Sequence, residues 1–181
     1  MAVYNETSII RSLFENGLEL LHIRKPDYSE AEMVLFLTAI GSDFRKQLVL
    51  HSHHHLSDSF GISRLHNSKT GHDTKNSIFS TSTHSITEFN TLEANYSYAF
   101  LSPVYPSISK PDYHSEQNLL ESIKKRINFD TKMVALGGIS AENITETLKK
   151  GFDNVALLGA IWNSTNPLEN FKICQQTVHS F

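Results

Sequence analysis

Short runs of Val, Ile, Leu and Phe alternate along this chain with longer stretches of helical character. Several of these runs are apolar at successive positions, as expected for parallel strands that are covered on both faces. We predict strands over Leu18–Ile23, Gln47–His51, Ile62–His66, Ser77–Thr81, Tyr98–Leu101, Lys132–Leu136 and Asn154–Leu158. Because strands and helices alternate, with no separate block of either, the pattern predicts an α/β fold. A small barrel and an open doubly wound sheet both fit it.

Polar residues, glycine and proline predict where the helices begin and end. Serine and glutamate stand three residues apart in two predicted capping boxes, Ser29 with Glu32 and Ser85 with Glu88. Single residues predict the other boundaries: Gly17 after a first helix, Ser140 before a helix that runs to Lys150, Gly151 after it, and Pro167 near the start of the last helix.

Composition narrows the class of protein. The 181 residues are enough for one domain, and we expect a single domain over residues 1–181. With 16 basic and 19 acidic residues, the chain lacks the basic excess of a nucleic-acid binder. Its longest apolar run, Met33 to Leu37, is far too short to cross a bilayer, so no membrane partner is expected. The one cysteine, Cys174, reads as a packed thiol and fits a cytoplasmic location.

Two predicted strands near the end of the chain run into glycines. Gly137 and Gly138 follow the Lys132–Leu136 strand, and Gly159 follows the Asn154–Leu158 strand. In a barrel these are the loops after the seventh and eighth strands, where backbone N–H groups commonly bind a phosphate. The alternative is that the glycines only make tight turns.

Two other strand ends carry groups suited to anions. The loop after Tyr98–Leu101 holds two hydroxyls and a cation, Ser107, Ser109 and Lys110, although a solvated surface loop would look similar. Arg24 and Lys25 follow the first predicted strand, where they would hold a phosphate or carboxylate or form an ordinary strand-end salt bridge.

Histidines stand at two more strand ends. His84 lies between a predicted strand and a capped helix, where an imidazole can move protons at neutral pH or serve structure alone. Four histidines fall within residues 51–55, but neighbours in a strand point to opposite faces and no carboxylate or thiol completes a ligand spacing. We therefore predict no specific metal site, only chance binding of nickel or zinc.

From about Leu18 to Trp162, these motifs together resemble the thiamin phosphate synthase/TenI superfamily, which are small phosphate-binding TIM barrels of vitamin B1 biosynthesis. The resemblance is carried by Ser102-Pro103-Val104-Tyr105-Pro106-Ser107-Ile108-Ser109-Lys110, Leu136-Gly137-Gly138-Ile139, Val155-Ala156-Leu157-Leu158-Gly159-Ala160-Ile161, Thr83-His84-Ser85 and His22-Ile23-Arg24-Lys25-Pro26. It implies a small (β/α)8-type barrel and a phosphorylated thiazole or pyrimidine as substrate.

The resemblance also implies roles for individual residues. In the synthases, diphosphate leaves a pyrimidine carbocation that a thiazole phosphate captures through its nitrogen. Ser107, Ser109 and Lys110 would lie at the diphosphate or thiazole side, and Gly138, Leu158 and Gly159 would offer N–H groups to the thiazole phosphate. Arg24 matches the arginine of the family's second strand, and Lys25 stands beside Pro26, which replaces the family's lysine.

The departures from the synthase pattern concern the metal site. Synthases hold Mg²⁺ with aspartates after the third and fourth strands, where this chain has His51-Ser52 and His66-Asn67-Ser68-Lys69, with Asp73 the nearest acid. Mg²⁺ needs oxygen ligands, preferably carboxylates. TenI-type members lack that site and isomerise a thiazole carboxylate phosphate with a histidine at the position of His84. We therefore expect a metal-independent tautomerase, with a Mg²⁺-dependent synthase and a non-catalytic regulatory binder as alternatives.

The start of the chain also departs from the family. Members begin with an apolar strand, whereas only Ala2-Val3-Tyr4 precedes Asn5 and Glu6 here, so the first barrel strand is missing or vestigial. A barrel without one strand exposes two edges of unpaired backbone groups. We therefore expect a homodimer that covers them.

Overall fold

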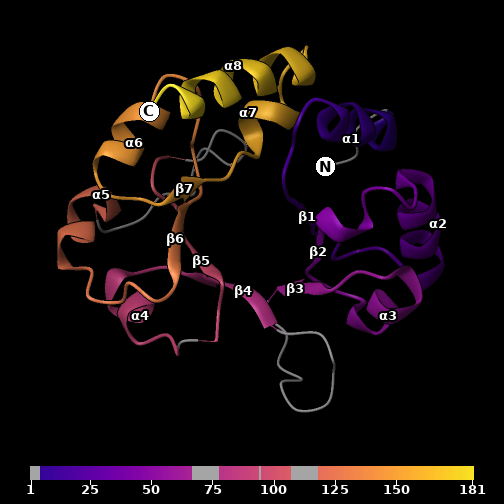
Figure 1. The fold of residues 1–181 in the computed structure, drawn as a ribbon, viewed down its shortest axis with the longest axis horizontal. Helices are drawn as coiled ribbons and strands as arrows, with labels where there is room; N and C mark the ends of the chain where they lie inside the picture. Colours follow the sequence, from indigo (N-terminus) through magenta and orange to yellow (C-terminus); the bar gives the residue numbers. More distant parts are fainter. Residues whose placement is uncertain (1–4, 67–77, 94, 107–117) are drawn as a thin grey trace. The chain divides into compact units, whose positions relative to one another are not determined.

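The computed structural model describes residues 5–66, 78–93, 95–106 and 118–181 (Figure 1). The chain forms two compact units, Met1–Ser80 and Thr81–Phe181. Within the described residues, seven strands are hydrogen-bonded in chain order. They are β1 Leu21–Ile23, β2 Leu48–Leu50, β3 Arg64–His66, β4 Ile78–Thr83, β5 Tyr98–Leu101, β6 Lys132–Ala135 and β7 Asn154–Val155.

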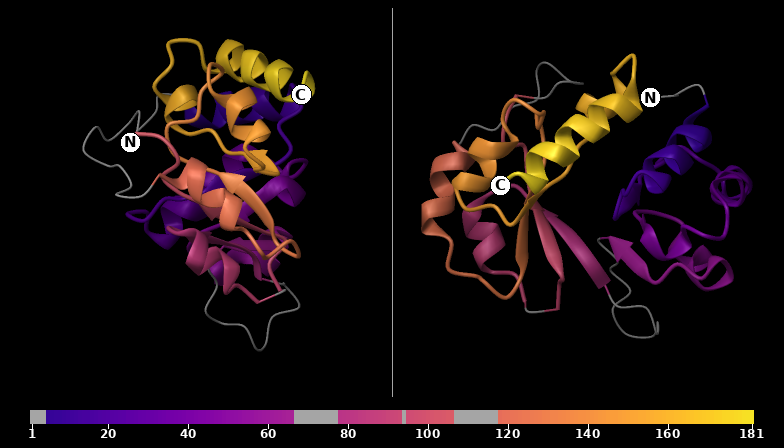
Figure 2. Two further views of the ribbon diagram at one scale, coloured as in Figure 1. Left: turned by 90° about the vertical axis from the view of Figure 1, so that its left-hand side faces the viewer. Right: turned by 45° about the horizontal axis from the view of Figure 1, so that its top comes forward.

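Within the described residues, helices separate each pair of successive strands except β3 and β4. The α-helices are α1 Glu6–Glu15, α2 Glu30–Ile40, α3 Ser57–Phe60, α4 Ile86–Asn90, α5 Leu119–Ser122, α6 Ile144–Lys149, α7 Gly159–Trp162 and α8 Pro167–His179. Short 3₁₀ turns cover Arg45–Gln47, His54–Leu56 and Ile123–Lys125. Within the second unit, α8 lies against α6 and α7 (Figures 1 and 2).

This topology confirms the predicted fold class. The strand pairs β1–β2, β2–β3, β3–β4, β5–β6 and β6–β7 are all parallel. Parallel strands that neighbour one another in chain order, with helices between them, have the topology of a small TIM-type barrel. All seven predicted strands are present, and α1 is the first element among the described residues.

The predicted helix boundaries hold with one correction. Gly17 and Gly151 have φ of 92° and 110° after α1 and α6, and Pro167 occupies the first turn of α8. Ser140, however, does not begin α6, which starts at Ile144 after Asn143. The Ser140 carbonyl accepts the N–H groups of Asn143 and Ile144, so a separate turn precedes the helix.

The two predicted capping boxes differ. At α2 the Ser29 hydroxyl accepts the Glu32 N–H at 3.3 Å, and the Glu32 carboxylate accepts the Ser29 N–H at 2.8 Å. At α4 the Ser85 hydroxyl accepts the Glu88 N–H at 3.1 Å, but the Glu88 carboxylate accepts the N–H of His84 at 2.7 Å. Only at α2 does the glutamate therefore accept the backbone N–H of its own N-cap residue.

Removing the first cap should weaken α2 measurably. The Ser29→Ala variant loses a side-chain acceptor for a backbone N–H that no helical carbonyl can reach, so we expect a loss of about 1 kcal/mol in unfolding free energy. The Glu32→Gln variant keeps an oxygen at that position and should lose less. Urea denaturation followed by circular dichroism measures both, and equal losses would contradict this account of the cap.

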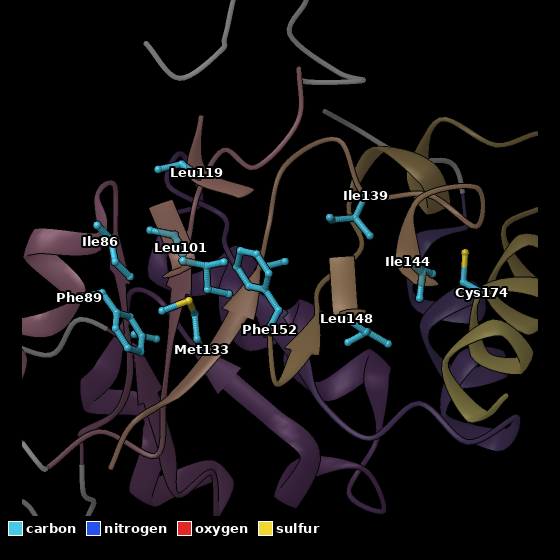
Figure 3. Packing of buried hydrophobic residues seen from close by; sticks show 13 residues of the cluster. Ile86, Phe89, Leu101, Leu119, Met133, Ile139, Ile144, Leu148, Phe152 and Cys174 are labelled. Atoms are coloured by element: carbon cyan, nitrogen blue, oxygen red, sulfur yellow. The ribbon is translucent and has the colours of Figure 1, made fainter. Parts of the chain in front are cut away.

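Each unit has its own buried core. In the first unit the fully buried side chains include Ile10, Met33, Leu37, Ile40, Leu48, Leu50, Ile62 and Leu65. In the second unit the core joins β5 and β6 to α4, α5, α6 and α8, and includes Phe89, Leu101, Met133, Ile144 and Leu148 (Figure 3). Cys174 belongs to this cluster with 2% of its surface exposed, as predicted for a packed thiol. Within the described residues, no helix is long and apolar enough to cross a membrane.

Candidate functional site

His84 is held in one orientation at the end of β4. Its ring Nδ1 lies 2.9 Å from the Ser102 carbonyl oxygen, and its backbone N–H donates to the Glu88 carboxylate at 2.7 Å. A carbonyl oxygen can only accept, so Nδ1 carries the hydrogen and Nε2 holds the lone pair. The side chain is exposed. The His84 ring is therefore oriented by the Ser102 carbonyl, and its role as an acid or base stays a prediction.

The loop after β5 packs directly on the glycines after β6. The Val104 N–H donates to the Leu136 carbonyl at 3.0 Å, and the Tyr105 N–H donates to the Gly137 carbonyl at 3.1 Å. A Cβ atom on Gly138 would lie 2.4 Å from the Pro106 carbonyl oxygen, and one on Gly137 would lie 2.8 Å from Pro103 Cα. These glycines therefore permit the close approach of two loops.

The other residues predicted to bind phosphate lie at the start of α7. The Leu158 carbonyl accepts the N–H groups of Ile161 and Trp162 at 3.1 and 3.0 Å, and Gly159 is the first residue of the helix. Gly137, Gly138, Leu158 and Gly159 thus all belong to the second unit, where they follow β6 and β7. Their binding of phosphate stays a prediction.

The cations after β1 lie in the first unit. Lys25 Nζ is 2.8 and 2.6 Å from the two carboxylate oxygens of Glu6, and the side chains are 15% and 16% exposed. It also lies 5.3 Å from the ring centroid of Tyr28. Lys25 thus forms a salt bridge, which is the second of the two roles predicted for the cations after this strand. The Arg24 side chain is exposed. Ser107, Ser109 and Lys110 fall outside the described residues.

Three histidines from neighbouring strands of the first unit meet. His22 Nδ1 lies 2.7 Å from His51 Nε2, and the rings of His51 and His66 stack with centroids 4.0 Å apart. The His22 and His66 rings meet edge to face at 5.4 Å. One ligand nitrogen from each of the three can be chosen so that all lie within 4.8 Å of one another.

The three imidazoles are neutral at physiological pH. Burial lowers the pKa of His22 to about 3, with the neighbouring His66 adding to the shift. Burial also lowers the pKa of His51 to about 2, helped by His66, His22, Arg24 and His54. For His66, burial and then the charge of His54 lower the pKa to about 4. Neutral imidazoles keep lone pairs that can bind a proton or a metal ion.

The sequence analysis missed this cluster because it compared histidines within one segment. His22 pairs with Val49 across β1 and β2, and Val49 pairs with Arg64 on β3. Two residues further on, His51 and His66 point to the same face as these partners, since side chains alternate along a strand. The signal was a histidine at or next to the end of three successive predicted strands, rather than the cluster at residues 51–55.

The described residues at these strand ends do not fit Mg²⁺. His22, His51 and His66 offer imidazole nitrogens, whereas Mg²⁺ takes oxygen ligands in octahedral geometry. Asp73, the nearest acid to the segment His66-Asn67-Ser68-Lys69, lies outside the described residues. No step that needs Mg²⁺ is therefore assigned to residues of this structure.

Comparisons with known proteins agree on one family. The family model described as thiamine monophosphate synthase matches residues 3–161. The structure resembles the thiamine phosphate pyrophosphorylase of Bacteroides thetaiotaomicron, with a TM-score of 0.80 and 30% identity over 99% of this chain and 93% of that one. The Pyrococcus furiosus thiamine phosphate pyrophosphorylase shares the fold at a TM-score of 0.82, with 18% identity over 98% of this chain and 91% of that one.

Similarity to curated proteins is more local. The chain is 37% identical to the thiamine-phosphate synthase of Streptococcus suis over 73 residues, which are 39% of this chain and 31% of that protein. Matches to the synthases of Bacillus velezensis and Geobacillus thermodenitrificans cover 41% and 42% of those proteins. These three matches thus span less than half of the relatives' own length.

Proposed function

This chain belongs to the thiamine monophosphate synthase family of thiamin biosynthesis, and from this premise we propose that it is a thiamine-phosphate synthase. The observation that carries the proposal is the agreement between the family match over residues 3–161 and the similarity to the Bacteroides thetaiotaomicron pyrophosphorylase across nearly the whole chain. The synthase is the alternative that the sequence analysis ranked second, and the comparisons favour it over the tautomerase.

The proposed reaction joins a pyrimidine diphosphate to a thiazole phosphate. The bond between the pyrimidine methylene carbon and diphosphate breaks, with its electron pair leaving on oxygen, and the thiazole nitrogen lone pair forms the new C–N bond. Backbone N–H groups of Gly138, Leu158 and Gly159 would hold the thiazole phosphate. Ser107, Ser109 and Lys110 would contact the diphosphate, whose negative charge a cationic loop stabilises.

A second candidate, a thiazole tautomerase, is favoured by His84. Its Nδ1–H donates to the Ser102 carbonyl, so Nε2 can take a proton from one position of a thiazole carboxylate phosphate and return it to another. This reaction needs no metal ion. The imidazoles of His51 and His66, which stand where the synthase pattern has oxygen ligands, are consistent with it.

One pair of assays separates these functions. The purified chain is incubated with hydroxymethylpyrimidine diphosphate, thiazole phosphate and Mg²⁺, and thiamin phosphate is measured with and without chelator. A parallel sample receives the thiazole carboxylate phosphate, and its isomerisation is followed. Chelator-sensitive thiamin phosphate formation supports the synthase. Isomerisation alone rejects the synthase in favour of the tautomerase, and binding of thiazole phosphate without turnover leaves a regulatory binder.

The His84→Asn variant tests the second candidate. Asparagine can still donate to the Ser102 carbonyl but cannot transfer a proton at neutral pH, so isomerisation should fall at least about 100-fold. Affinity for the phosphorylated thiazole should change little. His179→Gln, an exposed histidine at the end of α8, is the matched control in the same unit. An unchanged isomerisation rate in the His84→Asn variant would remove His84 from the reaction.

A further inference from the structure

The geometry points to a site for a zinc-class divalent cation in the first unit, formed by His22, His51 and His66 and oriented by Ser80. Neither proposed reaction uses these three imidazoles. The inference rests on strand register, on the distances between the rings and on the chemistry of nitrogen ligands. It does not depend on which of the two proposed functions is correct.

Strand register places four polar side chains on one face of the sheet. Across β1, β2 and β3, the pairs His22–Val49 and Val49–Arg64 face the same way, and His51 and His66 follow two residues beyond the level of His22. On the next strand Ser80 pairs with His66. Neighbouring strands lie about 4.8 Å apart, and side chains on one face recur about every 6.6 Å along a strand, so these side chains are within reach of a common ion. Three histidines and a serine therefore share one face of β1–β4.

The distances between the imidazole nitrogens are compatible with the binding of one metal ion. Two nitrogens at 2.7 Å, as between His22 and His51, must share one hydrogen, which a metal ion can replace. Zinc–nitrogen bonds of about 2.0–2.1 Å place two tetrahedral ligands about 3.3 Å apart, so the pair would separate by about 0.6 Å. The stacked rings of His51 and His66, inclined by 19°, require one ring to turn about its Cβ–Cγ bond.

Ser80 supplies the second layer of such a site. His66 Nδ1 lies 2.8 Å from Ser80 Oγ, and His66 is only 2% exposed. When Nδ1 donates to the hydroxyl, Nε2 carries the lone pair toward the other histidines. Histidine ligands characteristically donate their second nitrogen to such a partner, which fixes the ring's orientation.

The donor set selects the class of metal. Neutral imidazoles suit Zn²⁺ and other first-row transition ions, whereas Mg²⁺ and Ca²⁺ prefer oxygen. Three protein nitrogens leave the fourth tetrahedral position for water or an anionic oxygen, as in open zinc sites. Arg24 and His54 are close enough to influence His51, and both carry or can gain positive charge. An anion in the fourth position would offset that charge.

Zinc binding by the full chain tests the inference directly. Chelator-treated protein is titrated with ZnCl₂ in a calorimeter, with MgCl₂ as the comparison, and then loaded with Co²⁺ for visible spectroscopy. We expect one tight Zn²⁺ per chain, no heat from Mg²⁺ at the same concentrations, a tetrahedral Co²⁺ absorption band and a higher melting temperature with Zn²⁺. None of these readouts depends on catalysis.

Variants separate this site from chance binding by surface histidines. His22→Gln and His51→Gln should abolish the tight binding, and Ser80→Ala should weaken it about 10–100-fold. The His53→Gln/His55→Gln double variant, which removes two histidines outside the group, should bind as the unchanged protein does. Because His66 is deeply buried, His66→Gln is used only if circular dichroism shows it folded.

Three results would overturn the inference. They are no tight zinc binding by folded protein, binding that survives in both His22→Gln and His51→Gln, and binding that is lost in the His53→Gln/His55→Gln variant. The last result would assign zinc to His53 and His55, which follow β2.

Discussion

The Gly138→Ala substitution should lower the free energy of unfolding by about 2–5 kcal/mol. Gly138 has φ of 63°, a left-handed conformation that costs a residue with a Cβ about 1–2 kcal/mol. The added Cβ would also lie 2.4 Å from the Pro106 carbonyl oxygen and 2.6 Å from Tyr105 Cβ. Relieving such an overlap typically costs a further 1–3 kcal/mol or so.

Gly61 provides a matched control. It has φ of 64°, but no atom of the described residues, its two chain neighbours aside, lies within 4 Å of the Cβ that alanine would add. The Gly61→Ala variant should therefore show only the conformational cost of about 1–2 kcal/mol. Urea denaturation followed by circular dichroism compares the two variants, and fluorescence of Trp162 in α7 reports on the second unit. Equal losses would show that the loop after β5 adapts to the extra methyl group.

The same contact has a consequence for binding. Because the Val104 and Tyr105 N–H groups donate to the Leu136 and Gly137 carbonyls, moving one loop moves the other. Gly138, one of the residues proposed to bind the thiazole phosphate, stands on one of these two loops. A Gly138→Ala protein that still folds should therefore bind thiazole phosphate more weakly, whereas Gly61→Ala should not.

Much of the fold follows from local patterns in the sequence. Tyr98–Leu101 was predicted with the bounds that the structure shows, because an apolar run stands between polar residues on both sides. The first strand was predicted from Leu18 but begins at Leu21. The Leu18 N–H donates to the Leu13 carbonyl and the Gly17 N–H to the Phe14 carbonyl, which closes the end of α1. An apolar residue that completes a helix end looks like the start of a strand.

The candidate sites could be predicted only in part, because contacts between distant segments bring some of their residues together. His84 stood out because a strand end and a capped helix bracket it. His22, His51 and His66 did not, because only the pairing of β1, β2 and β3 shows that they share one face. Gly138 was read as a phosphate contact, and the structure adds a steric role, since the loop that fills the space beside it is 32 residues away along the chain at Pro106. Contacts of this kind need the tertiary structure.

The second large expected effect concerns Arg126, which joins the segments before β6 and β7. Its side chain is 7% exposed, and Nη2 lies 2.8 Å from Asp153 Oδ2 and 3.1 Å from the Thr131 carbonyl oxygen. Its Nε donates to the Asn128 carbonyl at 2.8 Å. The Asp153 carboxylate in turn accepts the Met133 N–H at 2.7 Å. One guanidinium thus donates to three carbonyls, those of Asn128, Thr131 and Gly151, and positions the carboxylate that accepts an N–H of β6.

Replacing Arg126 by methionine should lower the unfolding free energy by about 2–5 kcal/mol. Methionine keeps apolar contact with the Phe89 and Phe129 rings but leaves the part-buried carbonyls without their donors, at about 1–3 kcal/mol for each unsatisfied group. Arg126→Lys keeps the charge without the fork of donors, so its loss should be intermediate. Urea denaturation followed by Trp162 fluorescence measures the series.

The neighbouring Lys124 distinguishes a buried network from surface charge. Lys124 pairs with Glu121, but its side chain is 69% exposed, so water already solvates both charges. The Lys124→Met variant should therefore lose less than about 1 kcal/mol. If the Arg126→Met variant lost no more unfolding free energy than Lys124→Met, the contacts of Arg126 would stabilise the protein no more than an exposed ion pair does. A loss several times larger would show that the donors to the Thr131 and Asn128 carbonyls stabilise the segments before β6 and β7, because part-buried carbonyls regain hydrogen bonds from water only in part.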